Sequence, residues 1–161
     1  MNIREAVEGD LDGLVALLEQ LDEHVAGSNP RLWPAEGRRR EALLKTLRDD
    51  AACVLVAEAD GELIGYMAGR VGRWESGPPH VIGHLLWAFV CEEWRSRGAG
   101  RALVDRLLGF FESRGVEDIT LRYVIGNAHA ERFWAMLGFT PLICIANVRP
   151  EELRDKLGRM G

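Results

Sequence analysis

Residues 88–101 read AFVCEEWRSRGAGR, an apolar run followed by a basic, glycine-containing turn. The apolar spacing that comes next predicts a helix over 101–114, so the turn joins a strand to a helix. Gly98 and Gly100 permit backbone conformations closed to other residues and let a ligand approach the main chain. The first N–H groups of a helix are unpaired and carry the positive end of its dipole. Full positive charge comes from Arg95, Arg97 and Arg101. The turn is therefore predicted to bind a phosphate or pyrophosphate.

Other phosphate-binding motifs fit this turn less well. The chain contains no GxxxxGK[ST] sequence, which disfavours a P-loop nucleotide hydrolase. It contains no GxGxxG sequence, and the turn follows the fourth predicted strand instead of the first, which disfavours a dinucleotide site. By themselves, two glycines before a helix are also compatible with a plain strand-to-helix turn that binds nothing.

The rest of the chain predicts a single mixed α/β sheet with helices on both faces, in the order β-α-α-β-β-β-α-β-α-β. Asp10 is the expected N-cap of the first helix, Pro34 the expected start of the second, and Asp60-Gly61 a type I′ hairpin turn. The run Arg38-Arg39-Arg40 is expected to be a solvated helix face. Strands are predicted at 3–7, 52–58, 63–71, 81–91, 119–125 and 142–148, and later helices at 101–114, from Asn127 to Gly138, and in the charged tail 151–160.

Composition limits the classes of function. With 161 residues, 47% of them hydrophobic, the chain is expected to be one globular domain spanning 1–161. The net charge of −5 gives no basic footprint for nucleic acid, and no apolar run is long enough for a membrane span. Three widely spaced cysteines argue against a disulfide framework and a zinc site. We expect a cytoplasmic protein without a metal.

A second segment, nearer the C-terminus, makes the interpretation of the turn more specific. Residues 127–139 read NAHAERFWAMLGF. Together, the two segments resemble the GNAT (GCN5-related N-acetyltransferase) superfamily. Its first signature, [Q/R]-x-x-G-x-[G/A], is met by Arg95, Gly98 and Gly100. Its second, N-x-x-A-x-x-F-Y-x-x-x-G-F, is met by Asn127, Ala130, Phe133, Gly138 and Phe139.

The resemblance implies a sheet whose central strands splay apart and bind acetyl-CoA, the cosubstrate, in the gap. It implies that backbone groups of Phe89 and Val90 pair with the pantetheine arm. Asn127 and Phe133 are then expected beside that arm. The pyrophosphate is expected on the backbone N–H groups of Arg95, Ser96, Arg97, Gly98, Ala99, Gly100, Arg101 and Ala102. The reaction implied is direct transfer of acetyl to a primary amine of a small molecule or peptide, with the Val90 N–H polarising the thioester carbonyl and no metal taking part.

The chain departs from the family at two places where proton-handling groups are usual. Trp134 occupies the position of the common tyrosine, and indole cannot act as an acid near neutral pH. Leu86 and Trp87 occupy the positions of a common acidic pair. Tyr123 and His84 are the substitute candidates for catalysis, since both precede the second motif on predicted strands. Tyr66 and His80 are weaker candidates.

The acceptor is expected on the side of the early helices, opposite acetyl-CoA. Candidate acceptor residues are His24, Trp33 and Trp87, and Asp22, Glu23, Trp74 and Glu75 are further candidates near them, because aromatic and acidic groups suit a cationic amine. A different class of function is an acyl-CoA-binding sensor with little or no turnover. Many relatives are dimers, and the predicted strand 142–148 is a candidate for pairing in a homodimer. The sequence leaves this open.

Overall fold

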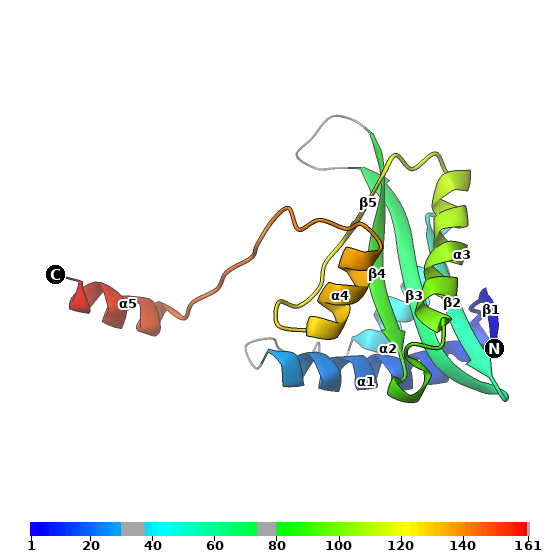
Figure 1. Ribbon diagram of the computed structural model, residues 1–161, viewed down its shortest axis with the longest axis horizontal. Helices are drawn as coiled ribbons and strands as arrows, with labels where there is room; N and C mark the ends of the chain where they lie inside the picture. Colours follow the sequence, from blue (N-terminus) through cyan, green and yellow to red (C-terminus); the bar gives the residue numbers. More distant parts are fainter. Residues whose placement is uncertain (30–37, 74–79, 161) are drawn as a thin grey trace. The chain divides into compact units, whose positions relative to one another are not determined.

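The computed structural model describes residues 1–29, 38–73 and 80–160. They form two compact units, Met1–Asn127 and Ala128–Gly161, which are described separately below. The first unit contains a five-stranded sheet in the order β1-β2-β3-β4-β5 (Figure 1). Its strands are β1 (Asn2–Glu5), β2 (Ala52–Ala59), β3 (Glu62–Arg73), β4 (Val81–Val90) and β5 (Asp118–Leu121).

Strands β1 to β4 pair antiparallel, and β5 pairs parallel to β4, which confirms the predicted mixed sheet. Asp60 and Gly61, between β2 and β3, have φ of 53° and 83°. Positive φ at both central residues is the requirement of a type I′ turn, so the hairpin prediction is confirmed. β5 ends at Leu121, before the predicted end at Ile125.

The two faces of the sheet are covered by different helices. On one face, α1 (Leu11–Ser28) and α2 (Arg39–Leu47) pack on an apolar cluster that includes Leu14, Tyr66 and Phe89. On the other face, α3 (Ala99–Ser113) approaches closely at Gly69 and Gly83. An added Cβ would lie 2.6 Å from Phe111 Cζ at Gly69 and 3.0 Å from the same ring at Gly83. Glycine is therefore required for this close helix-to-sheet packing.

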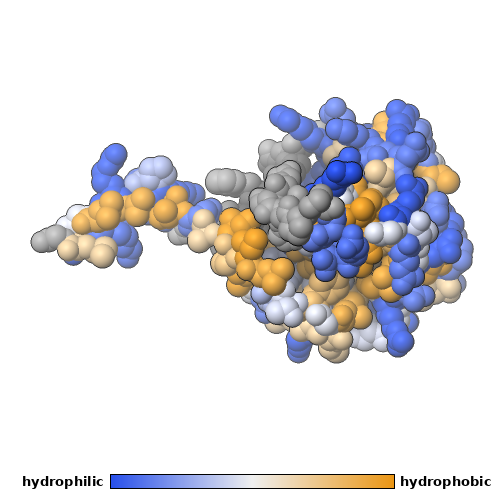
Figure 2. Space-filling view, turned by 90° about the horizontal axis from the view of Figure 1, so that it is seen from above, coloured by the Kyte–Doolittle hydropathy of each residue, from blue (hydrophilic) through white to orange (hydrophobic). Residues whose placement is uncertain are grey.

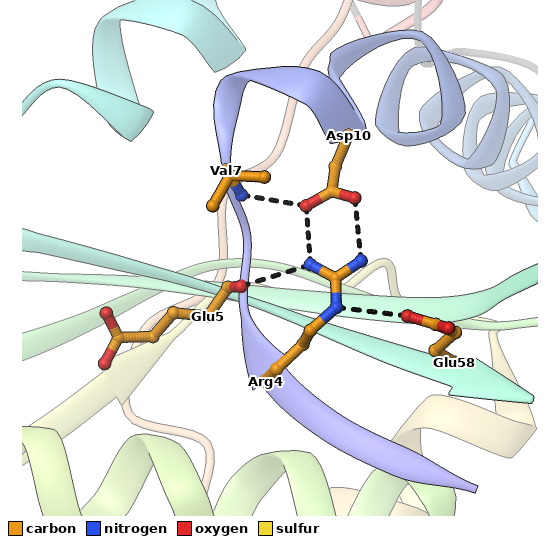
Figure 3. A network of polar contacts seen from close by, with 5 residues as sticks. All are labelled: Arg4, Glu5, Val7, Asp10 and Glu58. Atoms are coloured by element: carbon orange, nitrogen blue, oxygen red, sulfur yellow. Dashed lines mark hydrogen bonds and ion pairs between the residues drawn. The ribbon is translucent and has the colours of Figure 1, made fainter. Parts of the chain in front are cut away.

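The entry into α1 is fixed by a polar network around Arg4 of β1 (Figure 3). Arg4 donates two hydrogen bonds to the carboxylate of Asp10, at 2.7 and 2.8 Å, and a third to Glu58 of β2 at 3.0 Å. Asp10 also accepts the N–H of Val7 at 2.8 Å. Asp10 precedes α1 as predicted, but its carboxylate makes no cap bond to the helix because Arg4 and Val7 occupy it.

The start of α2 differs from the sequence prediction. Pro34 lies outside the described residues, which place Arg39 as the first residue of α2. Arg39 turns toward α1 and forms an ion pair with Asp22, with 18% of its side chain exposed. The prediction that Arg39 lies on a solvated face is therefore wrong, because a carboxylate on the neighbouring helix draws it inward.

The second unit contains α4 (Ala128–Met136) and α5 (Pro150–Arg159). Trp134 packs edge-on against Phe133 and Phe139, with centroid distances of 4.8 and 5.5 Å. The predicted strand 142–148 is wrong, since no ladder includes it in the part of the unit that is described. A nearly continuous apolar run such as LICIANV favours a strand, but a strand forms only where a partner edge supplies hydrogen bonds. Apolar side chains of this unit lie on its surface (Figure 2), including those of Leu142, Ile143 and Ile145.

Candidate functional site

A bulge divides β4 into two parts. Ala68 of β3 pairs with Trp87, but the next residue, Gly69, pairs with Leu85, so Leu86 is an extra residue. The parallel pairing with β5 also ends at this point, because its last pair is Leu85 with Leu121. Residues 81–85 therefore have a strand on each side. Residues 87–90 pair with β3 alone among the strands of the described chain.

The backbone of Val90 faces the open side of β4. The next residue, Cys91, donates its N–H to Ile64 O at 2.9 Å, so its peptide groups point toward β3. Peptide groups alternate along a strand, which directs those of Val90 to the open side and those of Phe89 back to β3. The Val90 carbonyl accepts a hydrogen bond from Arg95 Nε at 3.1 Å. Of the two residues expected to pair with pantetheine, Val90 therefore has the suitable orientation.

The basic turn carries unusual backbone conformations, as its composition predicts. It begins with η2 (Glu92–Trp94) and continues to Gly98, where φ is 90°. Ser96 also has a positive φ, of 61°. A Cβ at Gly98 would meet no atom within 4 Å, so the space beside it is open. Arg97 lies over the ring of Trp94, 5.2 Å from its centroid.

The first turn of α3 presents unpaired amides to this loop. The first helical bond runs from Ala102 N–H to Gly98 O at 3.0 Å. The N–H groups of Ala99, Gly100 and Arg101 precede it and have no partner within the helix. Ala102 and Arg95 were also expected to offer their amides, but Ala102 donates to Gly98 and Arg95 donates to Glu92 O at 3.1 Å. Of the amides predicted to bind an anion, those of residues 96–101 therefore remain candidates.

A cavity of about 270 Å³ lies between α1 and the end of β4. Its lining includes His24, which was predicted to bind the acceptor. It also includes Phe89 and Arg95, which were predicted to bind acetyl-CoA. Arg95 Cζ lies 5.8 Å from the centroid of the Phe89 ring. The other lining residues are Gln20, Glu23, Glu92 and Glu93. With three carboxylates, this wall favours positively charged groups.

The proton-handling candidates occupy different surroundings. His84 lies in the fully paired part of β4, and its Nδ1 is 2.9 Å from Thr120 Oγ1 of β5. His80 pairs with Asp118 at 3.6 Å. Tyr123 follows the end of β5 and is half-buried. Trp134 is 6% exposed and packs among aromatic rings, as expected of a core residue.

Of the remaining acceptor candidates, Trp87 packs partly buried against the cluster beneath α1. Trp33, Trp74 and Glu75 lie outside the described residues. The acetyl-CoA candidates Asn127 and Phe133 belong to different units, and Asn127 directly precedes α4.

Within the described ranges, no group of three His, Cys, Asp or Glu side chains is arranged to hold a metal ion. No helix in those ranges is long and apolar enough to cross a membrane.

Sequence reasoning missed the bulge at Leu86 and the inward position of Arg39. The run VIGHLLWAFV has no strand-breaking residue at the bulge itself, and its one glycine, Gly83, lies three residues before Leu86 and serves the packing of Phe111 instead. The sequence of α1 contains four acidic residues, so it did not indicate that Asp22 in particular would pair with Arg39. That pairing depends on how the two helices cross.

The chain therefore folds as a mixed α/β sheet in which one central strand has an open edge and leads into a glycine turn. Residues 18–139 match the model of the Acetyltransferase (GNAT) family. This is most of the chain, and the protein belongs to that family.

Individual relatives agree with this assignment. A mycothiol acetyltransferase from Thermobispora bispora is 34% identical over 91 residues, which are 56% of this chain and 31% of that protein. The chain thus matches about a third of that relative. The BH1408 protein from Bacillus halodurans superposes with a TM-score of 0.83 at 18% identity, covering 92% of this chain and 99% of the other. An aminoglycoside N-acetyltransferase, AAC(6')-Iy, in complex with CoA, superposes with a TM-score of 0.71 at 19% identity, covering 92% and 98%.

Proposed function

We propose that the protein is an acetyl-CoA-dependent N-acetyltransferase that transfers acetyl directly to a primary amine. The observation that carries the proposal is the open part of β4 leading straight into the anion-binding turn. The Val90 N–H faces the open side, and the amides of residues 96–101 follow within the same short segment. A pantetheine arm would add along the strand while its pyrophosphate occupies the helix N-terminus.

In the proposed reaction, the amine nitrogen attacks the thioester carbonyl carbon. A C–N bond forms, the C–S bond breaks, and CoA leaves as the thiolate. An amine that arrives as an ammonium group first loses a proton to solvent, because only the neutral nitrogen has a free electron pair for attack. After attack the nitrogen loses a second proton, and the thiolate takes one up. The Val90 N–H donates a hydrogen bond to the carbonyl oxygen as negative charge develops there. Acetyl-CoA thus supplies the acyl group, and the chain supplies alignment and polarisation.

The acceptor approaches from the α1 side in this proposal. His24 lines the cavity there, together with carboxylates of Glu23, Glu92 and Glu93. Negative potential raises the local concentration of protonated amines. One structural relative is an aminoglycoside N-acetyltransferase, and aminoglycosides are polycationic amines. Trp87 and, for proton transfer, His84 and Tyr123 remain candidates for roles in the acceptor step.

Amine-dependent release of CoA tests the function. The purified protein is incubated with acetyl-CoA and a panel of primary amines, and free thiol is measured. The expected result is CoA release that needs both an amine and the protein. In parallel, acetyl-CoA should raise the melting temperature in a saturable way.

The CoA-release assay and the melting curves together distinguish an acetyltransferase from a module that only binds acetyl-CoA. Trp134 packs among aromatic rings where the family often has tyrosine, which favours a binding module with weak turnover as the second candidate. Saturable binding without release from any amine would identify such a module. Absence of both binding and release would contradict the acetyl-CoA site itself.

A further inference from the structure

The side chain of Arg95 contacts the end of β4 in two ways. Its partly buried Nε donates a hydrogen bond to the Val90 carbonyl at 3.1 Å. Its Cζ lies 5.8 Å from the centroid of the Phe89 ring, a distance at which the face of an aromatic ring attracts a cation. Arg95 therefore connects the beginning of the glycine turn to the last residues of the open part of β4.

The peptide group that follows Val90 is held from both sides. Its carbonyl, Val90 O, accepts the hydrogen bond from Arg95 on the open side of β4. Its N–H, that of Cys91, donates to Ile64 O of β3 at 2.9 Å. A strand with an open edge leaves groups on that side unpaired. Arg95 thus supplies at this point the partner that a neighbouring strand would otherwise provide, and the peptide plane is fixed.

The peptide group that precedes Val90 directs its N–H to the same open side. An added Cβ at Gly65 of β3 would lie 2.7 Å from Phe89 O, so this carbonyl lies against β3. The carbonyl and N–H of a trans peptide group point in opposite directions. The Val90 N–H therefore points away from β3. Of the two Val90 groups on the open side, Arg95 engages the carbonyl and leaves the N–H for a ligand.

A thioester suits this arrangement better than an amide. An amide has an N–H and a carbonyl, and it adds to a strand through both groups. A thioester has sulfur where the amide has its N–H, so it accepts a hydrogen bond through its carbonyl and donates none. Val90 offers a donor, and Arg95 already occupies the neighbouring acceptor. This end of β4 is therefore suited to a carbonyl oxygen without an adjacent N–H.

We propose that Arg95 is a positioning residue that acts through Val90. By holding the Val90 carbonyl, its side chain fixes the direction of the Val90 N–H and keeps this N–H for the thioester carbonyl of acetyl-CoA. The Arg95 amide, which was expected to bind the pyrophosphate, donates to Glu92 instead, so the side chain is the part of this residue that acts on the site. The inference rests on the proposed function, because it concerns the carbonyl group that reacts.

Two neutral side chains of similar reach isolate the hydrogen bond. The amide nitrogen of glutamine is as many bonds from the main chain as Nε of arginine, and in methionine a methyl carbon takes that place. Arg95→Gln therefore keeps a donor for the Val90 carbonyl and removes the charge, whereas Arg95→Met removes both. The loss of charge is common to the two variants, so the difference between them measures the hydrogen bond.

The first measurement is the rate of CoA release with an amine that the wild-type protein uses. We expect kcat in Arg95→Met to be about 10- to 100-fold below kcat in Arg95→Gln, since a small misplacement of the polarising group reduces transfer this strongly. The KM for acetyl-CoA should be similar in the two variants, because the amides of residues 96–101 are unchanged. Melting temperatures without ligand show whether the variants are equally stable.

The second measurement needs no amine. S-Ethyl-CoA is the thioether that lacks the carbonyl oxygen of acetyl-CoA. Wild type and Arg95→Gln should bind acetyl-CoA about 2- to 10-fold more tightly than S-ethyl-CoA, the usual contribution of one hydrogen bond, and Arg95→Met should bind both equally. Calorimetric titration measures the dissociation constants.

Arg97→Met is the matched control for charge. It removes a guanidinium of the same turn, one that lies over Trp94 instead of contacting Val90. It should weaken the binding of acetyl-CoA and S-ethyl-CoA equally, because both carry the same phosphates, and should leave their ratio as in the wild type.

Several outcomes would overturn the inference. Equal kcat in Arg95→Gln and Arg95→Met would do so, as would a preference for acetyl-CoA over S-ethyl-CoA that survives in Arg95→Met. A lower melting temperature in Arg95→Met with an unchanged preference would show that the hydrogen bond only stabilises the turn. If the wild type released no CoA with any amine, the proposed function would be contradicted. The ratio of the two dissociation constants would still decide the inference in that case.

Discussion

The two parts of β4 have similar composition and opposite surroundings. Residues 81–85 lie between β3 and β5, and Gly83 accepts the ring of Phe111 from α3. Residues 87–90 lie past the bulge, pair with β3 alone among the described strands, and lead into the glycine turn. A strand with both edges paired has a structural role, whereas a strand with one open edge has hydrogen-bonding groups left for a ligand. The comparison predicts that substitutions in the first part lower stability and substitutions around the second part lower function.

The largest expected effect is at the turn that follows the open part. Gly98→Asp should abolish acetyl-CoA binding, because a side chain at φ 90° is strained and its carboxylate occupies the anion site. Gly109 in α3 also has open space around it, so Gly109→Asp adds the same charge elsewhere on that helix. Thermal shift and calorimetric titration with acetyl-CoA measure both variants. Equal affinity in Gly98→Asp and wild type would show that the turn does not bind the cofactor.

The next effect tests the orientation of Val90. Val90→Pro removes the N–H that faces the open side and leaves the ladder to β3 in place, since proline is tolerated at such edge positions. We expect kcat to fall about 100-fold, the usual effect of losing one oxyanion donor. Val90→Ala keeps the N–H and is the control. An unchanged kcat in Val90→Pro would assign carbonyl polarisation to another group.

A substitution in the paired part of β4, residues 81–85, should lower the stability of the protein without changing its affinity for acetyl-CoA. Gly83→Ala places a Cβ 3.0 Å from the Phe111 ring, and overpacking of this kind costs about 1–3 kcal/mol, or several degrees in melting temperature. Acetyl-CoA affinity should not change. Gly109→Ala meets no atoms and should stabilise α3 slightly. Reduced cofactor affinity in Gly83→Ala would remove the distinction between the two parts of β4.

The smallest effect concerns the Arg4 network, away from β4. The Arg4 guanidinium lowers the pKa of Asp10 below its usual value. The folded pKa lies below the unfolded one, so the stabilisation is present above about pH 4, where the unfolded carboxyl titrates, and is lost as pH falls below it. Arg4→Met should lower stability by about 1 kcal/mol at pH 7 and by less at pH 3. Urea unfolding at both pH values measures this. An equal loss at both would mean that the charge on Asp10 does not contribute.

The sequence alone determined the features that depend on residues close together along the chain. Positive φ at Asp60, Gly61 and Gly98 was predictable because turns and helix starts need residues that tolerate such conformations. The amphipathic spacing of Leu103, Leu107 and Phe111 predicted α3 and its buried face. The family motif was also readable, since it consists of short local spacings.

Tertiary structure decided whatever depends on a partner from another element. The bulge at Leu86 and the open edge after Leu85 arise from how β4 aligns with β3 and β5. The absence of a strand at 142–148 likewise reflects the lack of a paired edge, since the apolar composition of the segment suits a strand. Arg39 left its expected solvated face because α1 brings Asp22 to it. Hydrogen bonds and ion pairs between distant residues are satisfied only in the folded chain, so local pattern predicted the elements and packing selected the site.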